Sequence, residues 1–136
     1  PDVQFTDHGN TALMLAANKG HEACAQALLR AKANSDLQDR KGFTALMSAA
    51  LNGHNACAQA LLRAKANPDL QSSRGTTALI MAATGGYEAC VQALLRAKAN
   101  TDLQDSNGIA ALMEAAHEGH EACARALLRA KANTEL

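Results

Sequence analysis

Cysteines are the first residues of this chain that could do chemistry, because thiolates bind metals, form disulfides and act as nucleophiles. The four cysteines lie 33 residues apart, at Cys24, Cys57, Cys90 and Cys123. Equal spacing makes them one column of a repeat. Stacked helices lie about 8–10 Å apart, whereas a disulfide needs Cα atoms within about 7 Å. We therefore expect each cysteine to be a small buried hydrophobe. Free thiols and the lack of an N-x-[ST] sequence favour an intracellular, cytoplasmic protein.

The run HEGHE is the next candidate, because histidine and glutamate can bind zinc. Its histidines, His117 and His120, are three positions apart, not four as in the H-E-x-x-H pattern, and Gly119 is expected to end a helix between them. We expect His21 and His54 to form loop hydrogen bonds. No P-loop or G-x-S-x-G sequence occurs, and no convergent set of unlike ionisable groups is evident. We predict no metal, no cofactor and no enzymatic activity.

An arginine ladder could follow a nucleic-acid backbone. It consists of Arg30, Arg63, Arg96 and Arg129. Nearby acidic residues oppose its charge: Asp36, Asp69, Asp102 and Glu135. The whole chain has 13 basic and 13 acidic residues, and no aromatic residues alternate with the arginines for base stacking. We interpret the ladder as a solvated edge and predict no nucleic-acid binding. No apolar run reaches the roughly 18 residues of a membrane span, so we predict no membrane association.

The period of 33 residues indicates a stack of similar units. We divide the chain into one domain of four units, 6–38, 39–71, 72–104 and 105–136, with residues 1–5 as part of a preceding turn. Each unit has a polar turn ending in Gly, an apolar run ending in Gly, and a second run that contains ALLRAKAN. One helical pair of this size cannot bury its own apolar face, whereas stacked neighbours can. The sequence therefore predicts an all-α solenoid.

Helix signals recur within each unit. Thr11, Thr44 and Thr77 fit the N-cap position of the first helix, whereas the fourth unit has Ala110 and loses that cap. Four glycines are expected to close the first helices: Gly20, Gly53, Gly86 and Gly119. The second helix is predicted from about Glu22 to Ala31, with an apolar stripe of Cys24, Ala27, Leu28 and Ala31.

These residues resemble the ankyrin repeat family, whose units carry a T-P-L-H-x-A run followed by Gly-His. The matching run in the first unit is Thr11-Ala12-Leu13-Met14-Leu15-Ala16, with Gly20-His21 after it. The likeness covers essentially the whole chain. It implies an ankyrin-type α-solenoid of four helix–turn–helix units with short, hairpin-like β-turn connections. It also implies that turn tips and first helices line a concave groove that binds a protein partner.

Three departures from the family pattern concern stability. Alanine replaces the proline, and Met or Ile replaces the histidine, so the family's threonine–histidine bonding is absent. A lysine stands where the family has the glycine that ends the second helix, at Lys32, Lys65, Lys98 and Lys131. We expect either a lysine in the left-handed conformation in every unit or a helix that ends without that turn.

The four units also serve as their own comparison. Columns that stacking requires are constant, and variation concentrates in six columns of the turn tip and the first helix. An alternative interpretation is neutral drift at exposed positions. Against it, the exposed positions of the second helices vary far less between units than these six columns do. We predict these variable residues as the protein-binding site: Asp7, His8, Asn10, Leu15, Asn18, Lys19, Arg40, Lys41, Phe43, Ser48, Leu51, Asn52, Ser73, Arg74, Thr76, Met81, Thr84, Ser106, Asn107, Ile109, Glu114, His117 and Glu118.

The sequence favours a non-catalytic protein-recognition module that is a monomer. One alternative is a scaffold segment that self-associates head to tail, because both ends keep the apolar pattern of the interior, whereas terminal repeats normally carry a polar outer face. A segment cut from a longer array, or an engineered repeat without a native partner, would explain the same ends.

Overall fold

The computed structural model describes residues 12–135, and their side chains as far as Lys131. Thr11 and residues 1–10 lie outside the described residues. The described part forms eight α-helices and no strand. In chain order they are α1 (Ala12–Lys19), α2 (Glu22–Arg30), α3 (Ala45–Leu51), α4 (Asn55–Arg63), α5 (Ala78–Gly85), α6 (Glu88–Arg96), α7 (Ala111–Glu118) and α8 (Glu121–Glu135).

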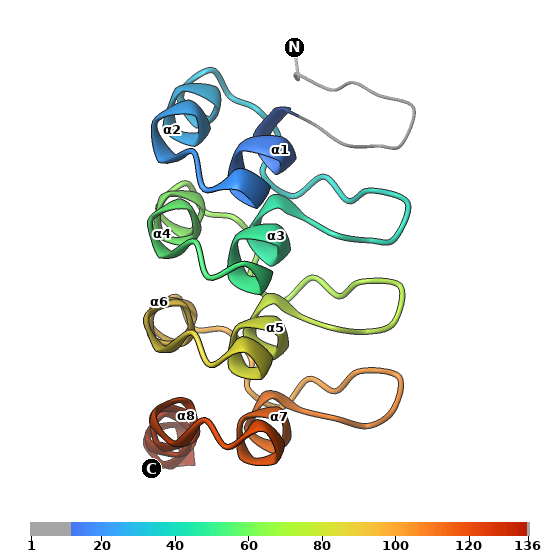
Figure 1. The fold of residues 1–136 in the computed structure, drawn as a ribbon, viewed down its shortest axis with the longest axis vertical. Helices are drawn as coiled ribbons and strands as arrows, with labels where there is room; N and C mark the ends of the chain where they lie inside the picture. The colour runs from blue at the N-terminus through green and yellow to red at the C-terminus, as the bar shows by residue number, and fades with distance from the viewer. Residues whose placement is uncertain (1–11, 136) are drawn as a thin grey trace.

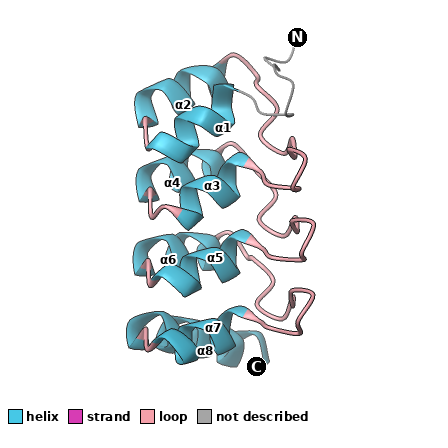
Figure 2. Ribbon diagram, turned by 45° about the vertical axis from the view of Figure 1, so that its right-hand side comes forward, coloured by secondary structure: helices cyan, strands magenta, loops and turns pink. Residues whose placement is uncertain are grey.

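The helices form two parallel columns (Figure 1). The first helix of each unit (α1, α3, α5, α7) packs on the first helix of the next, and the second helices (α2, α4, α6, α8) do the same. Each first helix also packs on the second helix of its own unit. The long loops project beside the first helices, away from the second helices (Figure 2). The predicted all-α solenoid of helix–turn–helix units is confirmed.

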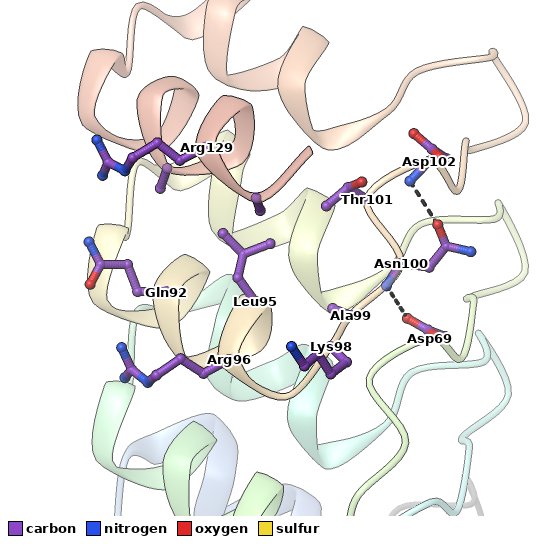
Figure 3. A pocket seen from close by; sticks show the side chains of 12 residues that line it. Asp69, Gln92, Leu95, Arg96, Lys98, Ala99, Asn100, Thr101, Asp102 and Arg129 are labelled. Carbon is purple, nitrogen blue, oxygen red and sulfur yellow. Dashed lines mark hydrogen bonds between the residues drawn. The ribbon is translucent and has the colours of Figure 1, made fainter. Parts of the chain in front are cut away.

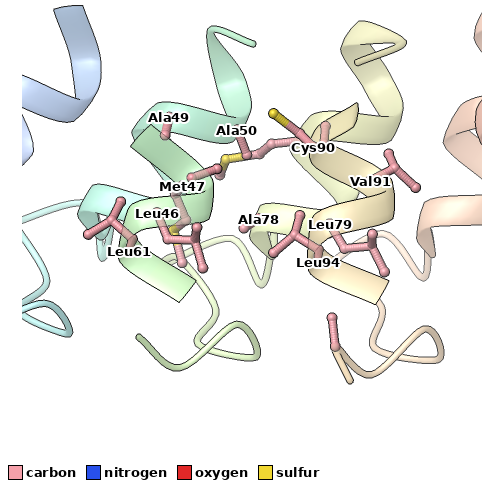
Figure 4. Close-up of a cluster of buried hydrophobic side chains, with 14 of the residues drawn as sticks. Leu46, Met47, Ala49, Ala50, Leu61, Ala78, Leu79, Cys90, Val91 and Leu94 are labelled. Carbon is pink, nitrogen blue, oxygen red and sulfur yellow. The ribbon is translucent and has the colours of Figure 1, made fainter. Parts of the chain in front are cut away.

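The core runs without interruption through the stack, as Figure 4 shows for the second and third units. Leu46, Leu61, Leu79 and Leu94 are each no more than 1% exposed. Alanines fill the space between them, and Ala50 is fully buried. Because alanine has so short a side chain, neighbouring backbones can approach closely and still exclude water.

Each long loop is a tight, hairpin-like turn. In the second unit, the Asp39 amide donates to Phe43 O at 2.9 Å and the Gly42 amide donates to Asp39 O at 2.9 Å. The same pair of bonds recurs in the third and fourth units. Adjacent turns are joined, since the Ser73 amide donates to Lys41 O at 2.9 Å. The predicted hairpin-like connections are therefore present, and they stack in register.

The N-caps of the first helices follow the sequence. The Thr44 hydroxyl accepts from the Met47 amide at 3.1 Å, and Thr77 accepts from the Ile80 amide at 3.1 Å. Both threonines are 2% exposed. Ala110 has the same extended backbone but offers no cap, so the first amides of α7 lack this partner.

Restoring the missing cap is expected to stabilise the fold. The A110T variant should raise the free energy of unfolding by about 1 kcal/mol, because a threonine cap satisfies one helix-terminal amide. Urea unfolding followed by circular dichroism measures the change. A110V is the control: it adds similar bulk without an acceptor, and it should not reproduce the gain.

The lysines that follow the second helices lie in the left-handed region, with φ values of 70° at Lys32, 71° at Lys65 and 67° at Lys98. In the second unit, the Lys65 amide donates to Leu62 O and the Ala66 amide donates to Leu61 O, both at 3.0 Å. This is the Schellman pattern. Ala66 is 5% exposed and joins the core, so the burial of the residue after the lysine holds the strained turn.

The fourth lysine behaves differently. Helix α8 continues through Lys131 to Glu135, and the Lys131 ammonium donates to Asp102 Oδ1 at 2.8 Å. The predicted alternative of a left-handed lysine is therefore confirmed at Lys32, Lys65 and Lys98. In the fourth unit the helix continues past the lysine.

Replacing Lys65 or Lys131 with glycine is expected to change the free energy of unfolding in opposite directions. K65G should raise the free energy of unfolding by roughly 0.5–1 kcal/mol. Relief of the left-handed strain on a non-glycine residue contributes about 1–2 kcal/mol, and loss of the favourable interaction between the lysine cation and the helix C-terminus offsets part of it. K131G should lower it by about 1 kcal/mol, because glycine disfavours a helix interior. Chemical denaturation of both variants tests the pair, and equal signs would contradict the assignment of the two conformations.

Candidate recognition surface

The variable residues of the turn tips and first helices are mostly exposed and lie on one side of the stack. Apart from Leu15 in the first unit, we call those that are exposed or half-buried the recognition surface: Asn18, Lys19, Arg40, Lys41, Phe43, Leu51, Asn52, Ser73, Arg74, Thr76, Thr84, Ser106, Asn107, Ile109, Glu114, His117 and Glu118. Asp7, His8 and Asn10 lie outside the described residues. The columns thus come together in space, although they are separated by whole units in the sequence.

One predicted column lies only partly on that surface, to which it contributes half-buried Glu114. Ser48 is 9% exposed and Met81 is 5% exposed, and Met81 is part of the core cluster. Leu15, in the same column, is 56% exposed. These side chains are covered where another first helix precedes theirs in the stack, and α1 has no such helix among the described residues. The prediction of an exposed site position was wrong for Ser48 and Met81.

The turn tips hold their basic residues in fixed positions. The Lys41 carbonyl accepts from the Ser73 amide at 2.9 Å, and the Arg74 carbonyl accepts from the Ser106 amide at 2.8 Å. The side chains of Lys41 and Arg74 are exposed, and within the described residues no hydrogen bond or ion pair engages them. Stacked tips therefore present cationic groups that are free to meet an acidic partner.

The first helices add an apolar and an acidic region. Leu51, a large apolar side chain on α3, is 47% exposed. On the fourth unit, Glu114 and Glu118 bring negative charge, and Thr84 Oγ1 donates to Glu114 Oε2 at 2.7 Å across the joint between units. The surface thus changes from basic at the second and third turn tips to acidic on α7.

The histidines join units and do not form a chemical site. His54 Nε2 lies 3.1 Å from Asn18 O, and His120 Nε2 lies 3.1 Å from Thr84 O. His120 therefore faces the preceding unit, while His117 contacts Glu118 at 3.1 Å on the exposed face. In the part of the chain that is described, no three His, Cys, Asp or Glu residues gather as a metal site. HEGHE is thus split between a structural joint and the recognition surface.

Three of the four cysteines are buried as predicted, and one is not. Cys57, Cys90 and Cys123 are at most 1% exposed, whereas Cys24 is exposed. Burial raises the pKa of the Cys90 thiol to about 11, with Cys123 nearby as the smaller cause. All four are free thiols. The prediction failed at Cys24 because the preceding unit covers this column, and no second helix precedes α2 among the described residues.

The arginine ladder lines shallow hollows on the other side of the stack. The largest, of about 840 Å³, lies between α6 and α8 and includes Arg96 and Arg129 (Figure 3). Its two acidic residues are already engaged, since Asp69 Oδ1 accepts from the Asn100 amide at 2.8 Å and Asp102 Oδ1 accepts from the Lys131 ammonium at 2.8 Å. No described helix has both the length and the apolar character that crossing a membrane requires.

The residues that shape the turn tips were missed in the sequence. Asp39 Oδ1 accepts from the Lys41 amide at 2.8 Å and the Phe43 amide at 2.9 Å, and Asp105 repeats this pair in the fourth unit. Ser72 replaces it in the third unit with bonds of 3.2–3.3 Å. The signal was available, because an Asp three residues before a glycine is typical of such turns.

Comparison with known proteins gives one family. The family model for ankyrin repeats (three copies) matches residues 1–72 and 53–136. No curated protein matches the chain. Because the two matches together cover the chain and the stacked helical pairs have the expected form, the chain belongs to the ankyrin repeat family.

Proposed function

We propose that this chain binds a protein partner through the recognition surface, without catalysis. Ankyrin repeats are generally protein–protein interaction modules, and the family is typically non-catalytic. We further propose that units 6–38, 39–71, 72–104 and 105–136 act as one domain in an intracellular protein, in keeping with the four free thiols.

A single observation carries the proposal: exposed residues vary between units far more on one side of the stack than on the other. The second helices expose Arg30, Arg63, Arg96 and Arg129 without variation. The equivalent exposed positions of the first helices read Asn18, Leu51, Thr84 and His117. Drift would affect both sides alike. Variation concentrated on one side is what a surface matched to a particular partner would show.

The charges of this surface describe the partner. Lys41 and Arg74 favour acidic residues opposite the second and third turn tips, and Glu114 favours a basic residue opposite α7. In the second unit, Leu51 and half-buried Phe43 offer apolar contacts. Arginine and large apolar residues are the usual anchors of protein interfaces. We therefore propose an extended partner segment that places acidic and apolar residues opposite the second and third units and a basic residue opposite the fourth.

Affinity capture tests the proposal with two matched variants. The surface variant carries K41A, F43A, L51A and R74A, and the back-face variant carries R30A, R63A, Q92A and R96A. Both change four exposed or half-buried positions. The wild type and the back-face variant are expected to retain the same captured protein from a cell extract, and the surface variant is expected to lose it. Loss with the back-face variant and retention with the surface variant would refute the proposal.

A further inference from the structure

The two ends of the described stack expose the two halves of one interface. At the first unit, Ala27 and Cys24 are exposed, whereas their equivalents in the later units are at most 6% exposed. At the fourth unit, Met113 is 49% exposed, whereas its equivalents Met14 and Met47 are 4% and 1% exposed. Side chains that are exposed only in the first unit therefore lie on the side of a unit that meets the preceding unit. Those that are exposed only in the fourth unit lie on the side that meets the following unit.

We call these surfaces the leading face (Leu15, Cys24 and Ala27) and the trailing face (Met113, Ala116 and Leu128). A hollow of about 380 Å³ adjoins the trailing face at Met113; Leu112 and Leu127 line it too, together with residues of the loop before α7. Leu128 beside it is 53% exposed. Apolar side chains around a hollow exclude water when a complementary surface fills them.

The interior joints show what fits the trailing face. Leu29 and Ala60 line one furrow between second helices, and Leu62 and Ala93 line the next. The third furrow repeats the pair with Leu95 and Ala126. The pair that would continue this series is Leu128 with the alanine of a following unit, and Ala27 is that alanine in the first unit.

The hydrogen bonds that join adjacent units also have one potential partner at each end of the described stack. His54 Nε2 meets Asn18 O, and His120 Nε2 meets Thr84 O, in each case across one joint at a separation of 36 residues. The next acceptor in this series is the carbonyl of His117, at the trailing end. The imidazole that matches it is His21, which is exposed at the leading end.

We propose that a second copy of this chain stacks head to tail on the first, with the leading face of one copy on the trailing face of the other. The contact repeats the joints that already hold the units together, so the column of paired helices continues from one copy into the next. A head-to-tail contact uses two different surfaces and leaves one of each free, so the assembly can keep growing. It does not use the turn tips, and it stands or falls independently of the proposed partner binding.

Two variants with one blocked end test this arrangement. A27E places a carboxylate in the leading face, and L128E places one in the trailing face; neither residue belongs to the recognition surface. In sedimentation velocity, the wild type is expected to increase in mean mass as its concentration rises. Each variant alone should remain a monomer. An equal mixture should form a species of two chains and no larger one, because one good joint and two blocked ends remain.

Controls separate this result from misfolding and from general stickiness. Cooperative unfolding by circular dichroism shows that each variant folds, and A27Q with L128Q serves as a milder pair. R63E, on an interior second helix, should assemble like the wild type. Cys24 offers a second readout: its reaction with a thiol reagent should slow at least tenfold as the wild type assembles, while that of A27E stays fast.

Three results would overturn the proposal. The first is a wild type that stays a monomer throughout the concentration series, in which case these faces are left to other repeats or another protein. The second is a single variant that assembles as readily as the wild type, which would indicate a different contact. The third is an equal mixture that stays monomeric while the wild type assembles.

Discussion

Replacing Met81 with alanine is expected to lower the free energy of unfolding by about 2–5 kcal/mol. Met81 is 5% exposed and lies within the continuous core, so the shorter side chain leaves a cavity that neighbouring helices cannot fill. Urea unfolding followed by circular dichroism measures the loss. This is the largest stability change expected for any variable residue of the first helices.

Leu51 provides the matched comparison. It is also a large apolar residue of a first helix, but it is 47% exposed, so L51A should change the free energy of unfolding by no more than about 0.5 kcal/mol. Equal losses in M81A and L51A would mean that the first helices do not pack as described. A neutral M81A would return Met81 to the recognition surface.

Replacing Gly42 with alanine is expected to cost about 2–4 kcal/mol, because two penalties act together. The backbone there has a φ of 78°, and left-handed strain on alanine costs about 1–2 kcal/mol. A Cβ at this position would also lie 2.8 Å from the Ser73 amide nitrogen and 3.0 Å from Ser72 Cα, both of which are backbone atoms of the next turn. The stacked tips would have to separate.

Gly108 isolates the first penalty. Its φ is 77°, but the nearest atom to an added Cβ is Gln104 Oε1 at 4.0 Å. G108A should therefore lose only about 1–2 kcal/mol. The difference between the two variants in the same unfolding measurement reports how tightly adjacent tips pack. If G42A and G108A lose the same amount, the tips are not in close contact.

Much of this architecture is predictable from the repeat period alone. Leu46 and Leu79 fall at the same place in successive units, so a column that is apolar in every unit must meet its own copies in the stack. The helix-ending glycines and the threonine caps at Thr44 and Thr77 also follow from local backbone chemistry. Each of these features can be predicted from the sequence of a single unit, or from the fact that the same residue recurs in the next unit.

The errors arose where burial depends on which neighbour is present. Helical periodicity identifies the side of a first helix that faces its own second helix, but the first helices before and after it cover two further sides. Met81 is therefore buried despite varying between units, and Cys24 is exposed despite being constant. The left-handed turn at Lys65 was left open for a related reason, since it depends on the burial of Ala66 against a neighbouring unit.

Charge reversal at the turn tips is the most direct measurement of the proposed function. The K41E/R74E variant and the back-face variant R63E/R96E each exchange two exposed cations for two anions. Their affinities for the captured partner can be compared by isothermal titration calorimetry. We expect K41E/R74E to bind at least tenfold more weakly than the wild type and R63E/R96E to bind within about twofold of it. Unchanged binding by K41E/R74E together with a loss in R63E/R96E would contradict recognition through the turn tips and first helices.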